Sequence, residues 1–549
     1  MGLLLLLSCG NKKEKNDAIA NTPEELKEKV TAYISNFLQE ALAGNGKTSD
    51  SSLQLRQAAV SKSLYDKQGN ISLWSENEIW RTGADSLYHL IENSRLLGLF
   101  PEDYHVKELQ AIRQQFKADS LFKGARKDAL LWSKADLMLT DALLQIIKDV
   151  KLGRLPNDSV TLNKDTLVTE DFFLQQINSL PQSGSFSLLV QSLEPFHRGY
   201  HQLKKGIKKF LDEADFKEYT RMPPPGKDID GYKKALQKRL FEGGYIAFDS
   251  VMADSARLTD AIKKFQKEKG ITVDGRAGEA TIRMLNLSDQ EKFIRIAISM
   301  DKYKKLPPMM PLKYIWVNAS SNYLDVMENA DVKFSSRIIC GKPRTRTPVL
   351  NSAVSVLITY PLWVPPPSIV SKEILPAVKK NPGYLARKGF SLLDKNGNEV
   401  DPYSVDWLKY SNRIPFRVVQ GSGDANALGV LKFHFDNKYS VYLHDTNQRY
   451  LFGNAMRSLS HGCVRVQDWE KLALYIIRND SLSSSGRYRM ADSLKTWLRN
   501  KEKHHLAIKN KMPVYIRYIT CEGKNGGVIF YDDVYGDDKL LREKYFAGK

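Results

Sequence analysis

The spacing of apolar residues changes part-way along the sequence. From about residue 23 to 220 they recur every three or four positions, as in 128–144, and this is typical of amphipathic helices. From Lys313 onward they alternate or form short runs, as in 314–318 and 354–360, and this is typical of β-strands. Because the two patterns occupy separate regions, we predict a multidomain α+β protein, helical first and mostly β towards the end.

The length and the prolines predict where the domains divide. A chain of 549 residues is too long for one hydrophobic core. Pro223, Pro224 and Pro225 form a stiff linker and mark the clearest boundary. We therefore expect a leader and tether at 1–22, an all-helical scaffold at 23–222, a small three-helix unit at 229–287 and a C-terminal domain at 288–545, with an inserted lid at about 365–414.

The first nine residues suggest export. Five leucines precede Ser8 and Cys9, a run too short to span a bilayer but typical of the end of a secretory signal. The residues before Cys9 resemble a bacterial lipobox, which implies that Cys9 is lipidated and that the protein is a lipoprotein anchored to a membrane. Plain secretion or a coding artefact is the alternative. No other stretch approaches about 18 uninterrupted apolar residues.

The net charge of +19, from 82 basic and 63 acidic residues, suits an acidic polymer such as nucleic acid, an anionic membrane surface or a carboxylate-rich cell wall. No zinc-knuckle spacing, phosphate-binding glycine loop or aromatic-basic RNA signature is found. We therefore expect no nucleic-acid partner.

One of the four cysteines has the surroundings of a nucleophile. Cys463 follows Ser460, His461 and Gly462, and His444 lies 19 positions upstream, at the end of a predicted strand. A neighbouring imidazole is the usual means of generating a reactive thiolate at neutral pH. Gly462 lets backbone N–H groups approach a reacting carbonyl. A buried structural cysteine beside unrelated histidines is the alternative reading.

The unit at 229–287 resembles a three-helix peptidoglycan-binding module. It has a leucine-containing first helix at 232–240, an alanine-to-Phe-Gln pattern at 261–266 and an Asp-Gly turn at 274–278. The resemblance implies that the module binds glycan. A generic helical linker domain is the alternative.

The segment 460–465, Ser-His-Gly-Cys-Val-Arg, resembles the signature of L,D-transpeptidases with the YkuD-type catalytic fold, and four further segments match, at 341–348, 368–376, 426–429 and 442–446. With the helical scaffold and the binding module in front, the chain resembles the large multidomain Gram-negative subclass. One departure is Val364 after Trp363, where the family pattern has asparagine. The resemblance implies a location in the periplasm or cell envelope, peptidoglycan stem peptides and glycan as partners, acylation by carbapenems, and no cofactor or metal. It identifies no protein partner.

The resemblance also implies roles for individual residues. Cys463 would attack the stem peptide to form a thioester, and His444 would be the general base. His461 would fix the loop or polarise the substrate, and it is the alternative base. The amides of Gly462 and Cys463 would form the oxyanion hole. Arg465 would bind a substrate carboxylate or brace the loop. Further expected substrate contacts are Tyr360, Trp363, Asn426 and Ser460.

The sequence leaves the acceptor open. The expected function is 3→3 cross-linking of stem peptides. A carboxypeptidase or hydrolase that uses water, or an enzyme that attaches proteins to the wall, would share the acylation step. A non-catalytic peptidoglycan-binding scaffold is the second alternative, and a redox role for Cys463 is the third, because no resolving cysteine lies near it in sequence.

Overall fold

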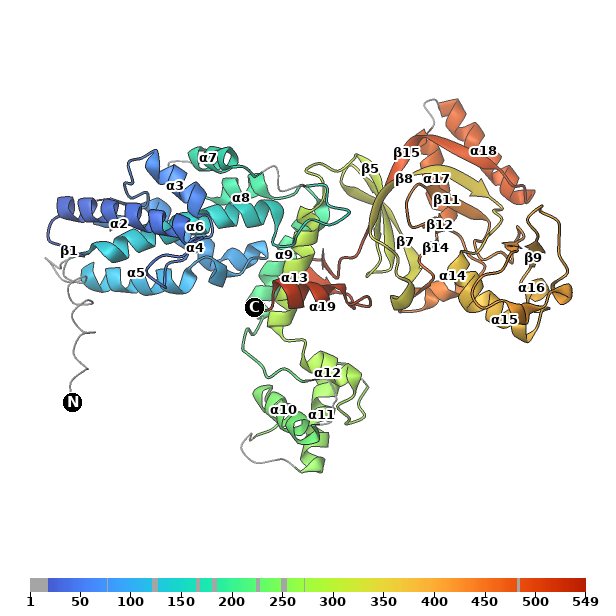
Figure 1. Ribbon diagram of the computed structural model, residues 1–549, viewed down its shortest axis with the longest axis horizontal. Helices are drawn as coiled ribbons and strands as arrows, with labels where there is room; N and C mark the ends of the chain where they lie inside the picture. The colour runs from blue at the N-terminus through green and yellow to red at the C-terminus, as the bar shows by residue number, and fades with distance from the viewer. Residues whose placement is uncertain are drawn as a thin grey trace. The chain divides into compact units, whose positions relative to one another are not determined.

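The computed structural model describes residues 18–76, 78–120, 127–163, 168–179, 185–223, 228–247, 254–270, 272–480 and 484–549 (Figure 1). The predicted lipidation site Cys9 lies outside these residues, as do Pro224 and Pro225. The chain forms two compact units. The first comprises Met1–Pro308, Cys521–Phe530 and Asp538–Lys549, and the second comprises Met309–Thr520 and Tyr531–Asp537.

The N-terminal part of the first unit is almost entirely helical, as expected. Its elements are β1 (Ile19–Ala20), α2 (Pro23–Ala43), α3 (Ala58–Asp66), β2 (Ser75–Glu76), β3 (Ile79–Trp80), α4 (Thr82–Glu92), η1 (Ser94–Leu97), η2 (Pro101–Asp103), α5 (Val106–Ser120), β4 (Lys127–Asp128), α6 (Ala129–Leu152), α7 (Glu170–Asn178), α8 (Ser187–Leu193) and α9 (Arg198–Glu213).

The central helix of this part is α6. The Asp128 side chain caps it by accepting hydrogen bonds from the Leu130 and Leu131 amides, and Gly153 ends it with a positive φ. Most of its side chains are buried, because α2, α3, α4, α5 and α8 pack around it. Its buried Asp136 accepts hydrogen bonds from the Tyr65 hydroxyl and the Leu73 amide. These contacts satisfy a carboxylate that would otherwise be costly to bury.

The predicted small unit consists of α10 (Ile229–Glu242), α11 (Ser255–Glu268) and α12 (Glu279–Leu285). Gln266 of α11 is buried and organises the Asp-Gly turn. Its side-chain oxygen accepts from the amides of Asp274 and Gly275, and its nitrogen donates to Asp274 and to Thr281. Gly275 has a φ of +73°, which favours glycine. The Phe-Gln and Asp-Gly pieces of the motif therefore serve one shared turn.

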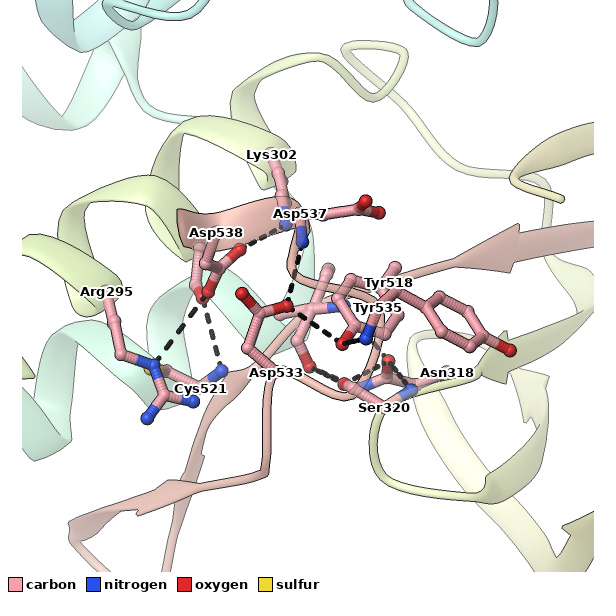
Figure 2. A network of polar contacts seen from close by, with 12 residues as sticks. Arg295, Lys302, Asn318, Ser320, Tyr518, Cys521, Asp533, Tyr535, Asp537 and Asp538 are labelled. Atoms are coloured by element: carbon pink, nitrogen blue, oxygen red, sulfur yellow. Dashed lines mark hydrogen bonds and ion pairs between the residues drawn. The ribbon is translucent and has the colours of Figure 1, made fainter. Parts of the chain in front are cut away.

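Helix α13 (Asp289–Lys304) belongs to the first unit, whereas we expected the catalytic region to begin at 288. Phe293 of α13 packs edge-on against Phe100 with ring centroids 5.1 Å apart. Asp538, at the base of α19 (Asp537–Tyr545), is buried and pairs with Lys302 of α13 at 2.7 Å (Figure 2). The hairpin of β16 (Cys521–Lys524) and β17 (Gly527–Phe530) also joins this unit by packing on α9.

The second unit is built on a nine-stranded sheet. Its strands are β5 (Lys313–Asn318), β6 (Tyr323–Glu328), β7 (Asp331–Gly341), β8 (Leu350–Thr359), β11 (Leu431–Phe435), β12 (Leu443–His444), β13 (Ser458–Ser460), β14 (Val464–Val466) and β15 (His505–Arg517). The order is β13-β7-β14-β12-β11-β8-β15-β5-β6, and β6 also pairs with β7, so the sheet closes on itself. The core lies inside this closed sheet and is completed by α17 (Trp469–Asp480) and α18 (Ser484–Arg499). Two single-turn helices, η4 (Pro343–Thr345) and η8 (Arg449–Gly453), lie in its loops.

The predicted insertion has a small core of its own, formed around Leu375, Leu392, Trp407 and Val418. Its elements are α14 (Pro367–Ile369), the π-helical turn η5 (Val370–Ile374), α15 (Leu375–Lys380), α16 (Tyr384–Arg387), β9 (Phe390–Leu393), η6 (Pro402–Ser404), η7 (Trp407–Lys409) and β10 (Arg417–Gln420). Strands β9 and β10 form a separate antiparallel pair.

In the described part of the chain, no helix has the length and apolar character needed to cross a membrane.

Candidate active site

Cys463 lies in the tight loop between β13 and β14. Gly462 has a φ of +120°, a backbone conformation that favours glycine. The Ser460 hydroxyl closes the loop by donating to the Cys463 carbonyl oxygen at 2.7 Å and accepting from the Gly462 amide at 3.1 Å. Ser460, which we expected to contact substrate, is therefore buried and holds the loop that carries the cysteine.

The segment after β7 holds this loop from one side. Thr345 Oγ1 donates to the Ser460 carbonyl oxygen at 3.0 Å, and Thr347 Oγ1 donates to the Gly462 carbonyl oxygen at 2.8 Å. The hydroxyl of Tyr535, whose ring stacks on that of Tyr518, in turn accepts from the Thr347 amide at 3.2 Å. Three segments distant in sequence thus fix the backbone around Cys463.

Of the two backbone amides expected to form an oxyanion hole, the loop around Cys463 keeps one without an acceptor in the described part of the chain. We expected the amides of Gly462 and Cys463 to share this role. The structure instead has the Gly462 amide donate to Ser460. Among the described residues, no acceptor is found for the Cys463 amide, so it is the one available to a developing oxyanion.

His444 sits on the strand next to the cysteine loop. Strand β12 pairs in parallel with β14, so that Leu443 lies opposite Val464 and His444 lies opposite Arg465. Leu443 and Val464 are fully buried in the core, and His444 and Arg465 therefore point to the other face of the sheet. The pairing brings Cys463 and His444 together across 19 positions of sequence.

The ring of His444 has a defined proton arrangement. Its Nδ1 lies 2.5 Å from the carbonyl oxygen of Asp445. A carbonyl oxygen only accepts, so Nδ1 carries the proton in the neutral ring, and the backbone of Leu428 also contacts the imidazole. Burial and the positive charge of Arg465 lower the pKa of His444 to about 3. The imidazole is therefore neutral near pH 7 and able to accept a proton.

The thiol of Cys463 rests in its protonated form. Burial raises its pKa, whereas hydrogen bonds from the backbone and hydroxyl of Tyr442, followed by the charges of Lys432 and Arg465, act in the opposite direction. The thiol donates to the Ser440 carbonyl oxygen at 3.9 Å. Among the described residues, no hydrogen bond joins the sulfur to His444. Such contacts often tighten only when substrate binds.

His461 has a different partner. Its Nε2 contacts the carboxylate of Glu373, which belongs to the π-helical turn of the insertion. The His461 side chain is about one-third exposed. This pairing occupies the ring nitrogen and ties the cysteine loop to the insertion.

Arg465 lies opposite His444 on the neighbouring strand. Its Nη1 donates to the Gln448 side-chain oxygen at 2.9 Å, whereas its Nε is buried and has no partner among the described residues. Burial lowers the pKa of its guanidinium. The charge of Arg465 therefore remains available to an anion at the site.

The other expected substrate contacts divide into two groups. The Trp363 indole hydrogen-bonds to Tyr442, the residue that also contacts the cysteine sulfur, so Trp363 reaches the site. Tyr360 and Asn426 are buried, and their polar atoms are taken by the backbone. The Tyr360 hydroxyl donates to the Leu498 carbonyl, and the Asn426 amide donates to the carbonyls of Pro361 and Gly421. In this structure both residues shape the loops around the site.

Two residues at the site were missed by the sequence reasoning. Tyr442 precedes His444 by two positions and therefore shares its face of the strand, a relation that strand alternation alone predicts. Lys432 lies opposite His444 on β11, a position that depends on the pairing register and gives no local signal.

Three regions of the chain match known protein families. Residues 312–482 match the family model "L,D-transpeptidase catalytic domain", residues 60–207 match "Scaffold domain" and residues 233–285 match "Putative peptidoglycan binding domain". A Haemophilus influenzae protein named "Putative L,D-transpeptidase" is 35% identical over 227 residues, which make up 41% of this chain and 45% of that protein. The match thus spans less than half the length of that relative.

Two solved structures are similar over part of the chain. An L,D-transpeptidase of Stackebrandtia nassauensis has 20% identity and a TM-score of 0.15, and the match covers 47% of this chain and 91% of that one. An L,D-transpeptidase of Xylanimonas cellulosilytica, residues 123–326, has 12% identity and a TM-score of 0.14 and covers 56% of this chain and all of that one. At these TM-scores neither likeness bears on the fold.

Proposed function

We propose that this chain, which carries an L,D-transpeptidase catalytic domain, a scaffold domain and a peptidoglycan-binding domain, forms 3→3 cross-links in peptidoglycan through a thioester on Cys463. One observation carries the proposal. Within the matched catalytic domain, a thiol, a neutral histidine whose Nδ1 donates to the backbone and an unpaired backbone amide gather at the ends of two paired strands.

In the acylation half, the Cys463 sulfur attacks the carbonyl of the third residue of a tetrapeptide stem while its proton passes to His444 Nε2. The Cys463 amide stabilises the oxyanion. The intermediate then collapses, the bond to the terminal D-alanine breaks, and His444 returns the proton to the leaving amine. The product is a thioester between Cys463 and the stem.

In the second half, the side-chain amine of a diamino acid on a neighbouring stem attacks the thioester. His444 accepts a proton from this amine, an amide forms as the carbon–sulfur bond breaks, and His444 returns the proton to the departing sulfur, which restores the thiol. No redox change occurs and no group is lost beyond the D-alanine released earlier. His444 is neutral at rest, so its ring can take up a proton in each half.

The module formed by α10, α11 and α12 would hold the enzyme on its polymer. The family match at 233–285 supports peptidoglycan as the substrate, and a peptidoglycan substrate places the protein in the cell envelope. The net charge of +19 suits a carboxylate-rich wall. Lipidation of Cys9 would add a membrane anchor, and a palmitate-labelling experiment with Cys9→Ala tests it.

Purified protein incubated with a defined tetrapeptide donor and an isotopically labelled acceptor stem tests the function. We expect a cross-linked dimer that carries the label, together with release of D-alanine, both read by mass spectrometry. A tripeptide without dimer would instead indicate the carboxypeptidase reaction, and a stem attached to added protein would indicate wall attachment. Absence of any acyl-enzyme under these conditions would favour a non-catalytic binding scaffold.

A further inference from the structure

Three neighbouring strands present a row of basic side chains beside the cysteine. Lys432 on β11 lies opposite His444 on β12, and His444 lies opposite Arg465 on β14. The residues next to them in sequence, Phe433, Leu443 and Val464, are fully buried in the core. Because side chains alternate along a strand, Lys432, His444 and Arg465 share the opposite face.

Neither cation of the row has a counter-ion in the described part of the chain. Lys432 is half-buried, and its ammonium lies 4.0 Å from the centre of the Tyr442 ring. No carboxylate lies within ion-pair distance of Lys432 among the described residues, and Arg465 contacts only the neutral amide of Gln448. Unpaired charges in such a place are costly unless an anion completes the site.

The other charged groups near the row are already paired. The Asp445 carboxylate is buried and bound by Arg449 at 2.6 Å. The insertion contributes Glu373, which contacts His461. Burial raises the pKa of Tyr442, so it is a neutral phenol near pH 7, and its hydroxyl contacts the Cys463 sulfur. The remaining group able to become an anion against both cations is therefore the Cys463 thiol.

We propose that Lys432 is a positioning residue for the catalytic pair: together with Arg465 it stabilises the Cys463 thiolate and opposes protonation of His444 at rest. The inference rests on the proposed function, because it takes Cys463 as the nucleophile. When the thiol loses its proton to solvent base or to His444 Nε2, the negative charge on the sulfur is attracted by both Lys432 and Arg465. The Tyr442 ring supports this arrangement by holding the lysine ammonium in a cation–π contact.

The two cations change the pKa of Cys463 and the pKa of His444 in the same direction. Lys432 lowers the pKa of Cys463 and also lowers that of His444, and Arg465 acts in the same way on both. Burial alone would hold the thiol protonated. A cation within several ångströms typically changes such a pKa by one unit or more. Removing the Lys432 charge should therefore raise the pH at which Cys463 becomes reactive by about one unit.

The experiment measures alkylation of Cys463 by iodoacetamide between pH 6 and 10 in the full-length protein, read by peptide mass spectrometry. Two neutral variants, Lys432→Met and Lys432→Gln, should shift the pH midpoint upward by about one unit and slow alkylation at pH 7 about tenfold. Lys432→Arg should keep the wild-type profile. Lys438→Met, a change of an exposed lysine just beyond the same strand, is the matched control and should leave the profile unchanged.

Two outcomes would overturn the proposal. An unchanged midpoint in both neutral variants would show that Lys432 does not act on the thiol, and an equal shift in Lys432→Arg would show that side-chain shape, not charge, matters. Alkylation does not require transpeptidation. A failed proposed function would appear as an inactive wild-type protein in the stem-peptide assay, whatever the alkylation profile shows.

Discussion

The Nδ1 of His444 lies 2.5 Å from the carbonyl oxygen of Asp445, the next residue in the chain. The acceptor is itself fixed, because the Asp445 side chain is buried and bound by Arg449 through both carboxylate oxygens at 3.1 and 2.6 Å. The ring is therefore held with its protonated nitrogen towards the backbone. This leaves Nε2 as the proton acceptor.

The two histidines of the site should differ in their effect on acylation. We expect His444→Ala to slow single-turnover acylation by a stem peptide by about 10²- to 10⁴-fold, the usual contribution of a general base. His461→Ala should retain most of the rate, because its Nε2 is engaged with Glu373. Intact-mass measurement of the acyl-enzyme over time distinguishes them. The reverse order would exchange their roles.

The other two cysteines of the described chain, Cys340 and Cys521, serve as controls for the assignment of Cys463 as the nucleophile. Cys463→Ala should abolish the covalent adduct with stem peptide and with a carbapenem. Cys340→Ala and Cys521→Ala should retain it, because both thiols are buried, and burial raises the pKa of Cys340 to about 12. Intact mass gives the stoichiometry. A full adduct on Cys463→Ala would exclude this residue as the nucleophile.

Stability should depend on pH through His444. Its pKa is lowered to about 3 in the folded protein, against about 6.5 when unfolded. The unfolded chain therefore binds more protons between these values, and the stabilisation is complete above pH 6.5 and is lost as the pH falls towards 3. In wild-type protein the calorimetric unfolding transition of the second unit should move to lower temperature as the pH falls from 6.5 towards 3.

A variant isolates the contribution of this histidine from that of other titrating groups. In His444→Gln the downward shift between pH 6.5 and 4 should be smaller than in wild type, since glutamine does not titrate. An identical shift in both proteins would mean that His444 is not held neutral by the fold.

Much of the architecture could be read from the sequence because it rests on local patterns. The family matches confirm the predicted catalytic, scaffold and peptidoglycan-binding regions. Apolar patterning predicted strands at 314–318 and 354–360, and the structure has β5 at Lys313–Asn318 and β8 at Leu350–Thr359.

The features that the sequence did not predict depend on contacts between residues that are distant in sequence. Lys432 reaches the site only through its register with His444, and residues 521–530 and 538–549 belong to the first unit although they follow the catalytic sheet in sequence. Asn426 and Tyr360 were expected to contact substrate, yet backbone carbonyls accept hydrogen bonds from their side chains. Residue type and spacing do not reveal which polar groups the fold itself uses.

The last prediction concerns the peptide plane that carries the oxyanion amide. Thr347 Oγ1 donates to the Gly462 carbonyl oxygen at 2.8 Å and also accepts from the Gly341 amide at 2.9 Å. The Gly462 carbonyl and the Cys463 N–H belong to the same planar trans peptide and point in opposite directions. Thr347 therefore aims the Cys463 amide by holding the other end of its peptide plane.

Thr347→Val keeps the shape of this side chain but removes both hydrogen bonds, leaving two buried backbone groups unsatisfied at a cost of about 1–3 kcal/mol each. Freed from the threonine, the peptide plane can rotate. We expect acylation by stem peptide, which requires the oxyanion amide, to fall at least tenfold, whereas iodoacetamide alkylation of Cys463, which forms no oxyanion, should change by less than threefold. Thr347→Ser restores the hydroxyl and should restore acylation. Equal loss in both reactions would mean that Thr347 only supports the fold of the loop.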